Sequence, residues 1–495
     1  MSGGRDVSEA FEAVCVRSSG RAAVRQGQET LTYGELLAWS QAISHALEPV
    51  VRAPGQRVAI MFPNSAAFVA SFFAVARLGG VVAPLNPHYG SHDLTAHLGD
   101  LDAAAVLADR DSMARVIGTL EAPPRVPALV EVSREGGARR LRKGTTAPPP
   151  IAGTFSAPPL LQQYTSGSTG TPKRVIRTHA NLLAELDSLA TTFAVTENDR
   201  FLGVAPFFHV NGLVRTMLTA MHSGATLFPV EQFRRREVIE LMTSERITFF
   251  GAVPQIFTIL SQTPARGAVD LSALRLVFSS SAPLLPVDNQ RFAERYRVVI
   301  RQLYGSTETG TISFNRDPGP EKRMDSLGTP LDRVRVQVVD EQGGALPVGS
   351  EGELAIASPF AISSYYGNEA ATAETFRDGF YRSGDLGTID GAGHVRLTGR
   401  KKLLINRGGF KVNPYEVEEV IKLHPRVVDV AVFGTVGPQG DDIVCCAIVA
   451  DGPCTTDDIL GHCRERLADF KVPARIEFRE SLPKSSTGKI LRGQL

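Results

Sequence analysis

The sequence concentrates phosphate-binding residue types in the run Tyr164–Lys173, which reads YTSGSTGTPK. Its glycines let the backbone fold tightly and present N–H groups, its hydroxyls add donors, and Lys173 adds a positive charge. This combination suits a polyphosphate, although the run does not match the Walker A pattern Gly-x-x-x-x-Gly-Lys-Ser/Thr. A flexible Ser/Gly loop has a similar composition. Because the run ends in Pro172-Lys173 and stands between two ordered elements, we favour a phosphate-binding loop.

A second loop, Tyr304–Thr309 (YGSTET), directly follows an apolar run of strand length. Ligands of doubly wound sheets collect beyond the carboxyl ends of the strands, where this loop would lie. Tyr304 could stack on a base, Thr307 could donate to a phosphate, and Glu308 could hold Mg²⁺ through its oxygens. Serine, threonine and glycine are also common in ordinary turns, so this loop alone does not define a site.

Three later segments carry charged residues that could complete such a site. In Tyr381–Leu386 (YRSGDL), the Asp385 carboxylate could accept hydrogen bonds from both hydroxyls of a ribose, or could belong to an ordinary turn. The basic run Gly399–Lys402 stands where the fold character changes and could form a hinge that faces an anion. Lys489 ends the run Pro483–Lys489 (PKSSTGK) and could swing into a distant active site, unless this tail is simply solvated.

Strand–helix–strand units must position these loops. Arg57–Phe62 is an apolar run of strand length, Ser65–Leu78 has helical periodicity, and Val81–Pro84 restarts an apolar run, which predicts parallel pairing. The alternation recurs in a strand, a helix and a strand at Phe201–Ala205, Asn211–His222 and Ala225–Val230, and further strands are expected at Leu274–Phe278 and Val298–Leu303. This pattern predicts doubly wound α/β layers.

The pattern changes twice later in the chain. After about Gly310, Arg333–Asp340 alternates with period two, Gly343-Gly344 supplies a turn and Glu353–Ala357 follows, which predicts antiparallel β-structure. Beyond Arg400, short strands mix with helices; these are expected at Asp429–Phe433, Ile443–Val449, Pro414–Leu423 and Asp457–Ala468. We therefore expect a large N-terminal domain over 1–400, made of doubly wound α/β subdomains and an antiparallel β subdomain, and a small mobile α+β domain over 401–495. Glu135–Pro150 is expected to be a surface loop.

Composition excludes several classes of protein. The chain has 495 residues, of which 43% are hydrophobic, and a formal net charge of +1, so neither a nucleic-acid groove nor an anionic membrane surface is indicated. We see no secretory signal and no apolar run of about 18 residues, so we expect a cytoplasmic protein without a membrane span. The cysteines lack paired CxxC spacing and are expected to be reduced, buried thiols. They are Cys15, Cys445, Cys446, Cys454 and Cys463.

Taken in order, the five segments resemble the motifs of the adenylate-forming superfamily, which includes acyl- and aryl-CoA synthetases, non-ribosomal peptide adenylation domains and beetle luciferases. The resemblance covers nearly the whole chain, from Leu31–Leu36 (LTYGEL) to Arg492. It implies ATP-dependent conversion of a small-molecule carboxylic acid to an acyl-adenylate, with Mg²⁺ as cofactor, CoA as co-substrate and a monomer or homodimer as the assembly. It also implies that the C-terminal domain rotates between two half-reactions.

The resemblance assigns roles residue by residue. The loop from Thr165 would wrap the β- and γ-phosphates, and Asp385 and Arg400 would hold the ribose. The implied nucleotide site consists of Thr165, Ser166, Gly167, Ser168, Thr169, Gly170, Lys173, Ser281, Ala282, Pro283, Tyr304, Gly305, Thr307, Asp385, Arg400 and Lys489. The implied catalytic residues are Lys489, Thr307, Glu308 and His209, with Glu308 as the Mg²⁺ ligand. The implied acyl pocket comprises His209, Val210, Asn211, Ser279, Ser280, Leu303, Gly305 and Gly310. Lys402 would be the hinge, and Gly408 and Gly409 would line a tunnel for the thiol.

Two departures from the family pattern bear on the ligands. Arg174 follows Lys173 where a glycine is usual, and this cation could help to bind phosphates or face solvent. Ser280 stands where a glycine is more common, which favours a small or polar-substituted acid, including an aromatic one, over a long fatty chain. An acid–CoA ligase is the leading hypothesis. The alternatives are loading of a carrier protein, transfer to an amine or activation of another oxyacid, and a non-catalytic ATP-binding protein, against which the intact charged residues of the motifs argue.

Overall fold

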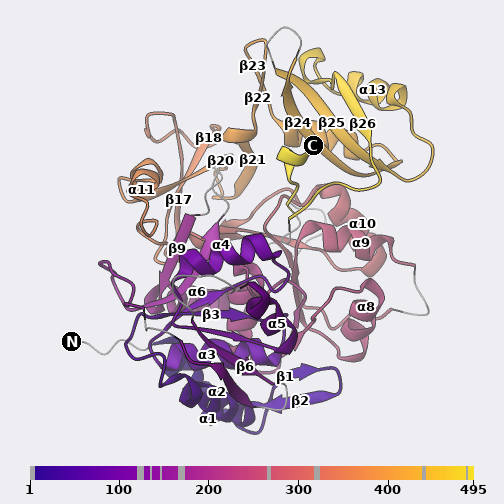
Figure 1. Ribbon diagram of the computed structural model, residues 1–495. Coiled ribbons are helices and arrows are strands. Elements are labelled where there is room, and N and C mark those ends of the chain that lie inside the picture. The colour runs from indigo at the N-terminus through magenta and orange to yellow at the C-terminus, as the bar shows by residue number, and fades with distance from the viewer. Residues whose placement is uncertain are drawn as a thin grey trace.

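The computed structural model of the protein describes residues 6–119, 127–133, 137–144, 148–165, 173–264, 269–316, 324–437, 442–485 and 489–495. Two large sheets with their helices form the lower body of the molecule in Figure 1, and a smaller antiparallel sheet and the C-terminal part lie above them. This is the predicted architecture of α/β layers, an antiparallel β part and a C-terminal α+β part.

The first large sheet is parallel in its middle and has an antiparallel strand at each edge. Its strands are, in order, β7 (Ala138–Arg142), β6 (Ala128–Val132), β5 (Ala105–Ala108), β3 (Arg57–Met61), β4 (Val81–Pro84), β8 (Pro159–Thr165) and β9 (Lys173–Thr178). Alternate residues of β3 enter different cores: Val58 and Ile60 pack on one face, Ala59 and Met61 on the other. Burial on both faces explains why this strand reads as a continuous apolar run.

Helices cover both faces of this sheet. Leu94, Leu98 and Met113 of two helices pack against β3 on one side. The helices of this sheet are α1 (Val7–Arg17), α2 (Tyr33–Leu47), α3 (Ala66–Arg77), α4 (Ser91–Leu101) and α5 (Arg110–Thr119). The predicted strand–helix–strand unit is confirmed within a residue or so at each end, because Ser65 caps α3 and the parallel partners β3 and β4 flank it.

The second large sheet has the same doubly wound plan. Its strands are, in order, β16 (Thr329–Pro330), β15 (Gly310–Phe314), β14 (Arg301–Ser306), β13 (Leu276–Ser279), β12 (Phe249–Ala252), β10 (Arg200–Gly203), β11 (Thr226–Pro229), β1 (Ala22–Gln26) and β2 (Glu29–Thr32). Its helices are α6 (His179–Thr192), α7 (Thr219–Ser223), α8 (Arg235–Ser244), α9 (Pro254–Gln262) and α10 (Pro286–Tyr296). Strand β14 begins three residues later than the apolar run at Val298 suggests, because pairing with β13 starts only at Arg301.

A π-helix, Asn211–Leu218, lies where the sequence predicts the first part of an α-helix. A Cβ added at Gly212 would lie 2.3 Å from the backbone oxygens of Ala205 and Pro206, so only glycine fits where this helix leaves the loop after β10. The π-helix is followed directly by the short α-helix α7. Such π-wound segments are frequent at functional sites.

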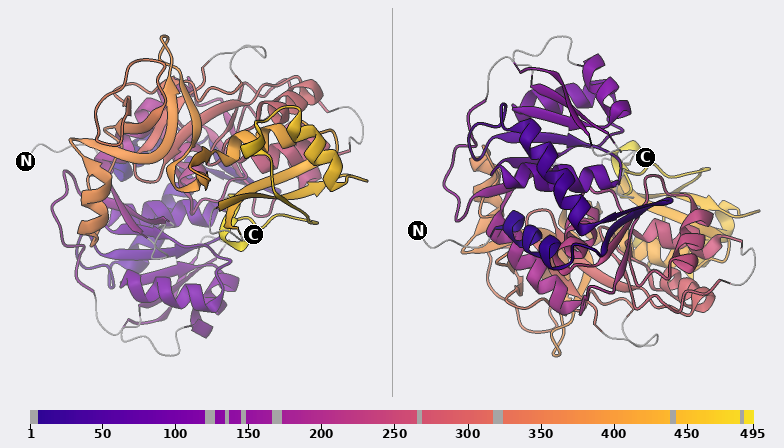
Figure 2. Two further views of the ribbon diagram at one scale, coloured as in Figure 1. Left: turned by 90° about the horizontal axis from the view of Figure 1, so that it is seen from above. Right: turned by 90° about the horizontal axis from the view of Figure 1, so that it is seen from below.

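The antiparallel part and the C-terminal part follow one another along the chain. The antiparallel sheet contains β17 (Arg335–Val339), β18 (Gly352–Ala357), β19 (Phe376–Arg377), β20 (Phe380–Ile389) and β21 (Val395–Arg400), and α11 (Glu369–Thr375) packs beside it. The C-terminal part contains β22 (Ile405–Arg407), β23 (Phe410–Val412), α12 (Pro414–Lys422), β24 (Val427–Val436), β25 (Asp442–Ala450), α13 (Thr456–Arg464) and β26 (Arg475–Phe478). Seen from above and from below, the end of the chain lies where this part meets the large sheets (Figure 2).

One expectation of the sequence is wrong in part. Within Glu135–Pro150, residues Ala138–Arg142 form the edge strand β7, which pairs antiparallel with β6. The strand carries exposed arginines, and charged side chains are a common feature of sheet edges. The composition of this segment indicated a loop because the strand is held by backbone hydrogen bonds to β6. Its side chains are largely charged and therefore give no apolar strand pattern.

All five cysteines are free, as expected, and four of them are buried, whereas Cys454 is partly exposed. None of the helices in the described ranges is long and apolar enough to cross a membrane.

Candidate active site

Asp385 is the centre of the first cluster of predicted site residues. The antiparallel register of β20 and β21 places Asp385 opposite Arg400, whose Nε lies 3.0 Å from Asp385 Oδ1. Tyr304, near the end of β14, donates its hydroxyl to Asp385 Oδ2 at 2.7 Å. Burial raises the pKa of Asp385, and Arg400, the Tyr304 hydrogen bond and Lys489 offset part of that effect. Three predicted nucleotide-binding residues from three strands therefore meet.

Glu308 forms a second cluster with the end of the phosphate-binding loop. The loop that holds Thr307 and Glu308 is closed by a bond from the Thr309 amide to Ser306 Oγ, 3.1 Å long. Tyr365 donates its hydroxyl to Glu308 Oε1 at 3.0 Å, and Lys173 Nζ lies over the Tyr365 ring, 4.3 Å from its centroid. The buried Tyr365, which sequence reasoning missed, thus joins two predicted motifs.

Lys489 reaches these clusters from the other end of the chain. Its backbone oxygen accepts from the Ser485 amide at 2.8 Å, and Lys484 and Ile490 form a bridge beside it, so the two ends of the loop are fixed together. Lys484 Nζ lies 2.5 Å from Asp429 Oδ2, which ties this loop to β24. The loop is therefore anchored on the C-terminal part.

The environment of Lys489 contains the charges of both clusters. Although solvent reaches Lys489, the protein walls around its ammonium group displace bulk water and lower its pKa; Arg400 adds to this effect, and Asp385 and Glu308 oppose it. Burial, followed by the charge of Lys489, lowers the pKa of His209 to about 4. Asp385, Glu308, His209 and Lys489 thus share one electrostatic environment, although they come from distant parts of the sequence.

The predicted acyl pocket surrounds the start of the π-helix. Val210 is its N-cap, and Asn211 is its first residue, 3% exposed, with neither side-chain atom hydrogen-bonded within the described part of the chain. Ser279 and Ser280 at the end of β13 are also buried, and Leu303 lies in the apolar core.

Two of the predicted pocket glycines have a steric reason to be glycine. A Cβ at Gly305 would lie 2.3 Å from Arg215 Nη2 and 2.4 Å from the Gly310 oxygen. Gly310 has a φ of 69°, and its Cβ would lie 2.7 Å from Glu185 Oε2. The chain therefore approaches a buried charged group at both positions.

That charged group is a cluster of Arg177, Glu185 and Arg215, which sequence reasoning missed. Glu185 Oε2 accepts from Arg177 Nη2 at 2.5 Å, and Glu185 Oε1 accepts from the Thr311 hydroxyl at 2.7 Å. Arg215 donates from Nε to Thr311 Oγ1 at 3.1 Å. The available signal was Arg215, the single charged residue of the π-helix, whereas β9 and α6 carry other charged residues that hide Arg177 and Glu185. Such residues are rarely buried unless they are paired.

Several predicted residues lie beside the clusters or outside the described residues. Thr165 pairs with Lys173 across β8 and β9, so the two ends of the phosphate-binding loop are tied together. The predicted residues Ser166, Gly167, Ser168, Thr169 and Gly170 between them lie outside the described residues. Ser281, followed by Ala282 and Pro283 in the predicted adenine loop, has a φ of 76°, a strained conformation for serine of the kind found at binding sites.

The predicted hinge residue directly follows the Asp385 cluster in the chain, and the predicted tunnel residues lie in the hairpin beyond it. Lys402 is exposed in the short 3₁₀ turn η2 (Lys401–Leu403), immediately after the last strand of the antiparallel sheet. Gly408 and Gly409 are exposed, have φ values of 56° and 86°, and form the turn of the β22–β23 hairpin. A Cβ at either glycine would meet nothing within 4 Å, so in this arrangement the turn alone explains them. Their tunnel role stays a prediction.

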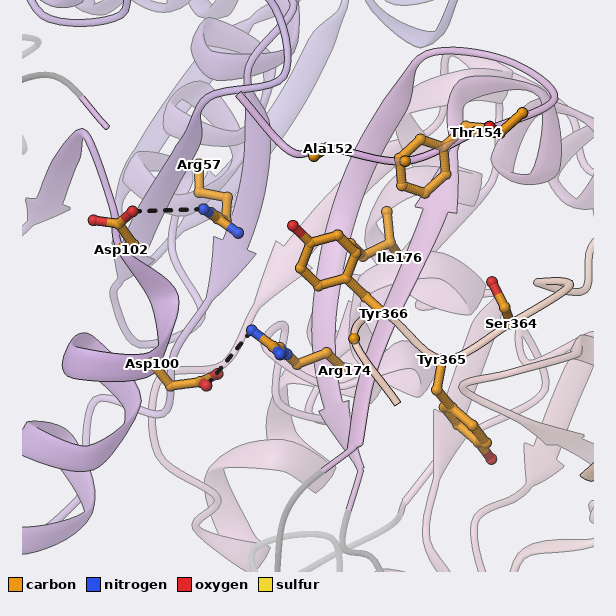
Figure 3. A pocket seen from close by; sticks show the side chains of 13 residues that line it. Arg57, Asp100, Asp102, Ala152, Thr154, Arg174, Ile176, Ser364, Tyr365 and Tyr366 are labelled. Atoms are coloured by element: carbon orange, nitrogen blue, oxygen red, sulfur yellow. Dashed lines mark ion pairs between the residues drawn. The ribbon is translucent and has the colours of Figure 1, made fainter. Parts of the chain in front are cut away.

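Arg174 is held away from the predicted phosphate site by its own partners. Its Nη1 lies 3.6 Å from Asp100 Oδ1, and its guanidinium lies 5.0 Å from the centroid of the Tyr366 ring. Arg174 lines a pocket of about 600 Å³ beside β9, where Arg57 faces Asp102 in the same way (Figure 3). Of the two possibilities left open for this cation, an orientation away from the phosphates fits these contacts better.

Comparison with known protein families agrees with this architecture. Residues 11–366 match the model of the AMP-binding enzyme family, and residues 416–489 match that of the AMP-binding enzyme C-terminal domain. The chain belongs to the AMP-binding enzyme family. One relative is a feruloyl-CoA synthase from an Amycolatopsis species, which is 33% identical over 480 residues that cover 96% of this chain and 95% of the relative. Another is the long-chain-fatty-acid–CoA ligase FadD13 from Mycobacterium tuberculosis, which is 32% identical over 93% of this chain and 92% of the relative.

A solved member of this family has nearly the same structure. ATP-bound MatB from Rhodopseudomonas palustris is 25% identical and superposes with a TM-score of 0.87 over 99% of this chain and 98% of MatB. Apo MatB superposes over the same shares with a TM-score of 0.76. The arrangement of the whole chain is therefore closer to that of ATP-bound MatB.

Proposed function

We propose that this AMP-binding enzyme activates a carboxylic acid with ATP, releases pyrophosphate and transfers the acyl group from the acyl-AMP to the thiol of CoA. The observation that carries the proposal is the common electrostatic environment of Lys489 with Asp385 and Glu308, more than a hundred residues earlier. The names of the relatives, a feruloyl-CoA synthase and a long-chain-fatty-acid–CoA ligase, support an acid–CoA ligase.

The nucleotide is held by its phosphates, ribose and base. The loop that begins at Thr165 and ends at Lys173 binds the β- and γ-phosphates through backbone N–H groups and the lysine charge. Asp385, fixed by Tyr304 and Arg400, accepts hydrogen bonds from the ribose hydroxyls. The adenine lies between Tyr304 and the loop that contains Ser281.

Glu308 fits the role of a Mg²⁺ ligand. Its carboxylate supplies the oxygen donors that Mg²⁺ prefers, and the Tyr365 hydroxyl orients it at 3.0 Å. The described residues contain no group of three acidic, histidine or cysteine side chains that could hold a metal alone. This suits Mg²⁺, which commonly binds through one or two carboxylates and the phosphates of a substrate. When bound, the ion neutralises charge on those phosphates.

Adenylation requires two anions to approach each other. An oxygen of the acid attacks the α-phosphorus of ATP, and the bond to the pyrophosphate oxygen breaks. Lys489 supplies a positive charge to both the acid carboxylate and the α-phosphate, and Thr307 donates to that phosphate. His209 is uncharged at neutral pH because its pKa is about 4, so it does not repel Lys489 and closes the acyl pocket as an apolar gate.

The second half-reaction is assigned to a rotated arrangement of two domains, 1–400 and 401–495, with Lys402 as hinge. Strand β21 ends at Arg400, and the C-terminal strands begin at Ile405, so only the short turn η2 joins the two parts. Rotation withdraws Lys489 and presents the hairpin that carries Gly408 and Gly409 to the acyl-adenylate. The thiol then attacks the acyl carbon, and AMP leaves.

The test is ATP–pyrophosphate exchange with the full-length protein over a panel of carboxylic acids, followed by mass spectrometry after CoA is added. Acid-dependent exchange and an acyl-CoA product support the proposal. Exchange without an acyl-CoA product would support adenylation but indicate that the acceptor is a carrier protein or an amine rather than CoA. Absence of exchange with every acid class would refute adenylation.

A further inference from the structure

Arg215 is a fully buried cation beside the predicted acyl pocket. The residue lies in the π-helix, one turn after Asn211, and is 1% exposed. Its Nη1 lies 3.5 Å from the hydroxyl of Ser280, and its Nη2 lies where a side chain at Gly305 would be. The charge of Arg215 is also near enough to lower the pKa of Lys489. The guanidinium therefore contacts a predicted pocket residue and lies within electrostatic range of Lys489.

The charge cluster around Arg215 is not balanced. Arg177 and Arg215 contribute two positive charges, and Glu185 contributes one negative charge; all three side chains are fully or almost fully buried. Burial lowers the pKa of Arg215 to about 10, which still leaves it protonated at neutral pH. A buried charge without a counter-charge is costly, so one uncompensated positive charge requires an explanation.

The hydrogen bonding of Arg215 and its neighbours is also incomplete. Within the described residues, Arg215 Nη2 is buried and has no hydrogen-bond partner, and the same holds for the polar side-chain atoms of Asn211, Oδ1 and Nδ2. Arg177 leaves Nε and Nη1 unpartnered as well, on the other side of Glu185. Each buried unpartnered donor costs about 1–3 kcal/mol, and more for a charged group. Such costs are tolerated where a ligand supplies the partner.

We infer that Arg215 is the binding site for a second carboxylate of the acid, and that the preferred substrates are short dicarboxylic acids. This inference rests on the proposed function and adds the substrate class. The reacting carboxylate lies at Lys489, and the second one meets the Nη1–Nη2 edge of Arg215, with Ser280 and Asn211 as further donors. One added negative charge neutralises the Arg177–Glu185–Arg215 cluster.

A carboxylate explains these features better than a neutral polar group. A hydroxyl or an amide would satisfy Nη2 but would leave the excess positive charge. A planar carboxylate matches the paired N–H groups of a guanidinium edge. A fatty chain would place methylene groups against a buried cation and leave both Arg215 and Asn211 unpaired.

The experiment compares matched substrates with the wild-type full-length protein. Rates of ATP–pyrophosphate exchange are measured for short dicarboxylic acids, their monomethyl esters and monocarboxylic acids of equal chain length. Sites built to pair with a substrate group reject analogues that lack it by about 10⁴–10⁵. We expect kcat/KM for the best diacid to exceed that of its monoester by on the order of 10³ or more.

Variants assign the preference to Arg215. Arg215→Met should abolish the preference, so that the diacid is used no better than its monoester, and Arg215→Lys should keep part of it. Arg177→Met is the matched control, because it removes another buried arginine from Glu185 but leaves the donors of Arg215 in place. It also removes one positive charge from the cluster, so the preference should weaken in this variant but fall much less than in Arg215→Met. Should Arg215→Met fail to fold by circular dichroism, Ser280→Ala replaces it, with an expected several-fold loss of the preference.

The outcomes separate the two proposals. Exchange supported equally by monocarboxylic acids and diacids in the wild type would overturn the inference and leave adenylation intact. A preference that survives Arg215→Met would also overturn it. Absence of exchange with any acid would overturn the proposed function, and the substrate inference with it.

Discussion

At the scale of single residues, each oxygen of Asp385 has a protein partner in the folded chain, Arg400 on one and Tyr304 on the other. The carboxylate is thereby fixed before any ligand binds, which would lower the entropic cost of positioning the ribose that we propose it holds. Glu308 is oriented in the same way by a single hydroxyl, that of Tyr365. Substitutions of the residues that hold these two carboxylates should therefore weaken ligand binding, even though the carboxylates themselves remain.

Tyr365→Phe tests the orientation of Glu308. The variant keeps the ring beneath Lys173 and loses only the hydroxyl that donates to the carboxylate. Partners of this kind change metal affinity by about 10–100-fold, so we expect the Mg²⁺ concentration for half-maximal exchange to rise by about tenfold. Tyr366→Phe, one residue away, should leave it unchanged. An unaltered Mg²⁺ dependence in Tyr365→Phe would contradict the role given to Glu308.

His209 predicts a pH dependence of stability. Its pKa in the folded chain is about 4, below its ordinary value of 6.5, so the unfolded chain binds more protons between these values. His209 therefore contributes stability that is complete above about pH 6.5 and is lost as the pH falls toward 4. In urea denaturation, His209→Asn should flatten the decline of unfolding free energy over this window. His88→Asn, a change at an exposed histidine, should not; equal slopes in both variants would exclude this origin.

At the scale of elements, the π-helix positions two residues of the proposed acyl pocket and its surroundings. It begins directly against the loop after β10, and it brings Asn211 and Arg215 to successive turns of one helix. The widened winding is possible because Gly212 has no side chain between the helix and the backbone oxygens of Ala205 and Pro206. The position of this helix therefore depends on one close backbone approach.

Gly212→Ala should disturb this element. Its Cβ would overlap two backbone oxygens that cannot rotate away, and overpacking of this kind typically costs about 1–3 kcal/mol. We expect the free energy of unfolding to fall by about 2 kcal/mol. Gly99→Ala in the exposed part of α4, where a Cβ would meet nothing within 4 Å, should instead raise it by about 0.5–1 kcal/mol. Chemical denaturation of both variants gives the comparison, and a stable Gly212→Ala protein would show that the helix can shift.

The sequence predicts the strands of the large sheets well because parallel strands are buried on both faces and read as apolar runs, as Arg57–Met61 does. It also predicts the site motifs, since loops at strand ends carry the polar residues. It does not predict the π winding at Asn211 or the pairing of Glu185 with Arg177 and Arg215, because both depend on contacts between distant elements. The sequence does not predict strand β7 for the same reason. This strand is held by backbone hydrogen bonds to β6, and its own side chains carry no apolar pattern.

At the scale of the whole molecule, one buried ion pair joins the N-terminal body to the C-terminal part. Asp288 on α10 lies 3.5 Å from Lys422 on α12, and their side chains are 7% and 4% exposed. Burial raises the pKa of Asp288, and the charge of Lys422 offsets part of that effect. A rotation of the C-terminal part about Lys402 would have to separate this pair, so the pair favours the present arrangement.

Asp288→Asn should make that arrangement less stable. Removing one partner of a buried pair is strongly destabilising, which in this position acts on the contact between the two parts. We expect the single-turnover rate of acyl transfer to rise relative to adenylation by several-fold. Glu341→Gln is the matched control: it disrupts an exposed pair with Lys411, 4.0 Å apart, and such pairs contribute about 0–1 kcal/mol. Equal rate ratios in wild type and Asp288→Asn would show that the pair does not restrain the rotation.

The most direct test of the enzyme as a whole is ATP–pyrophosphate exchange in Lys489→Ala. The loop that carries this lysine is fixed to the C-terminal part, and its ammonium group shares the environment of Asp385 and Glu308. Loss of one well-placed charge at a reacting centre typically costs on the order of 10²–10³ in rate. We predict a loss of this size with an unchanged melting temperature, while Lys411→Ala keeps full exchange. Exchange at the wild-type rate in Lys489→Ala would contradict the account.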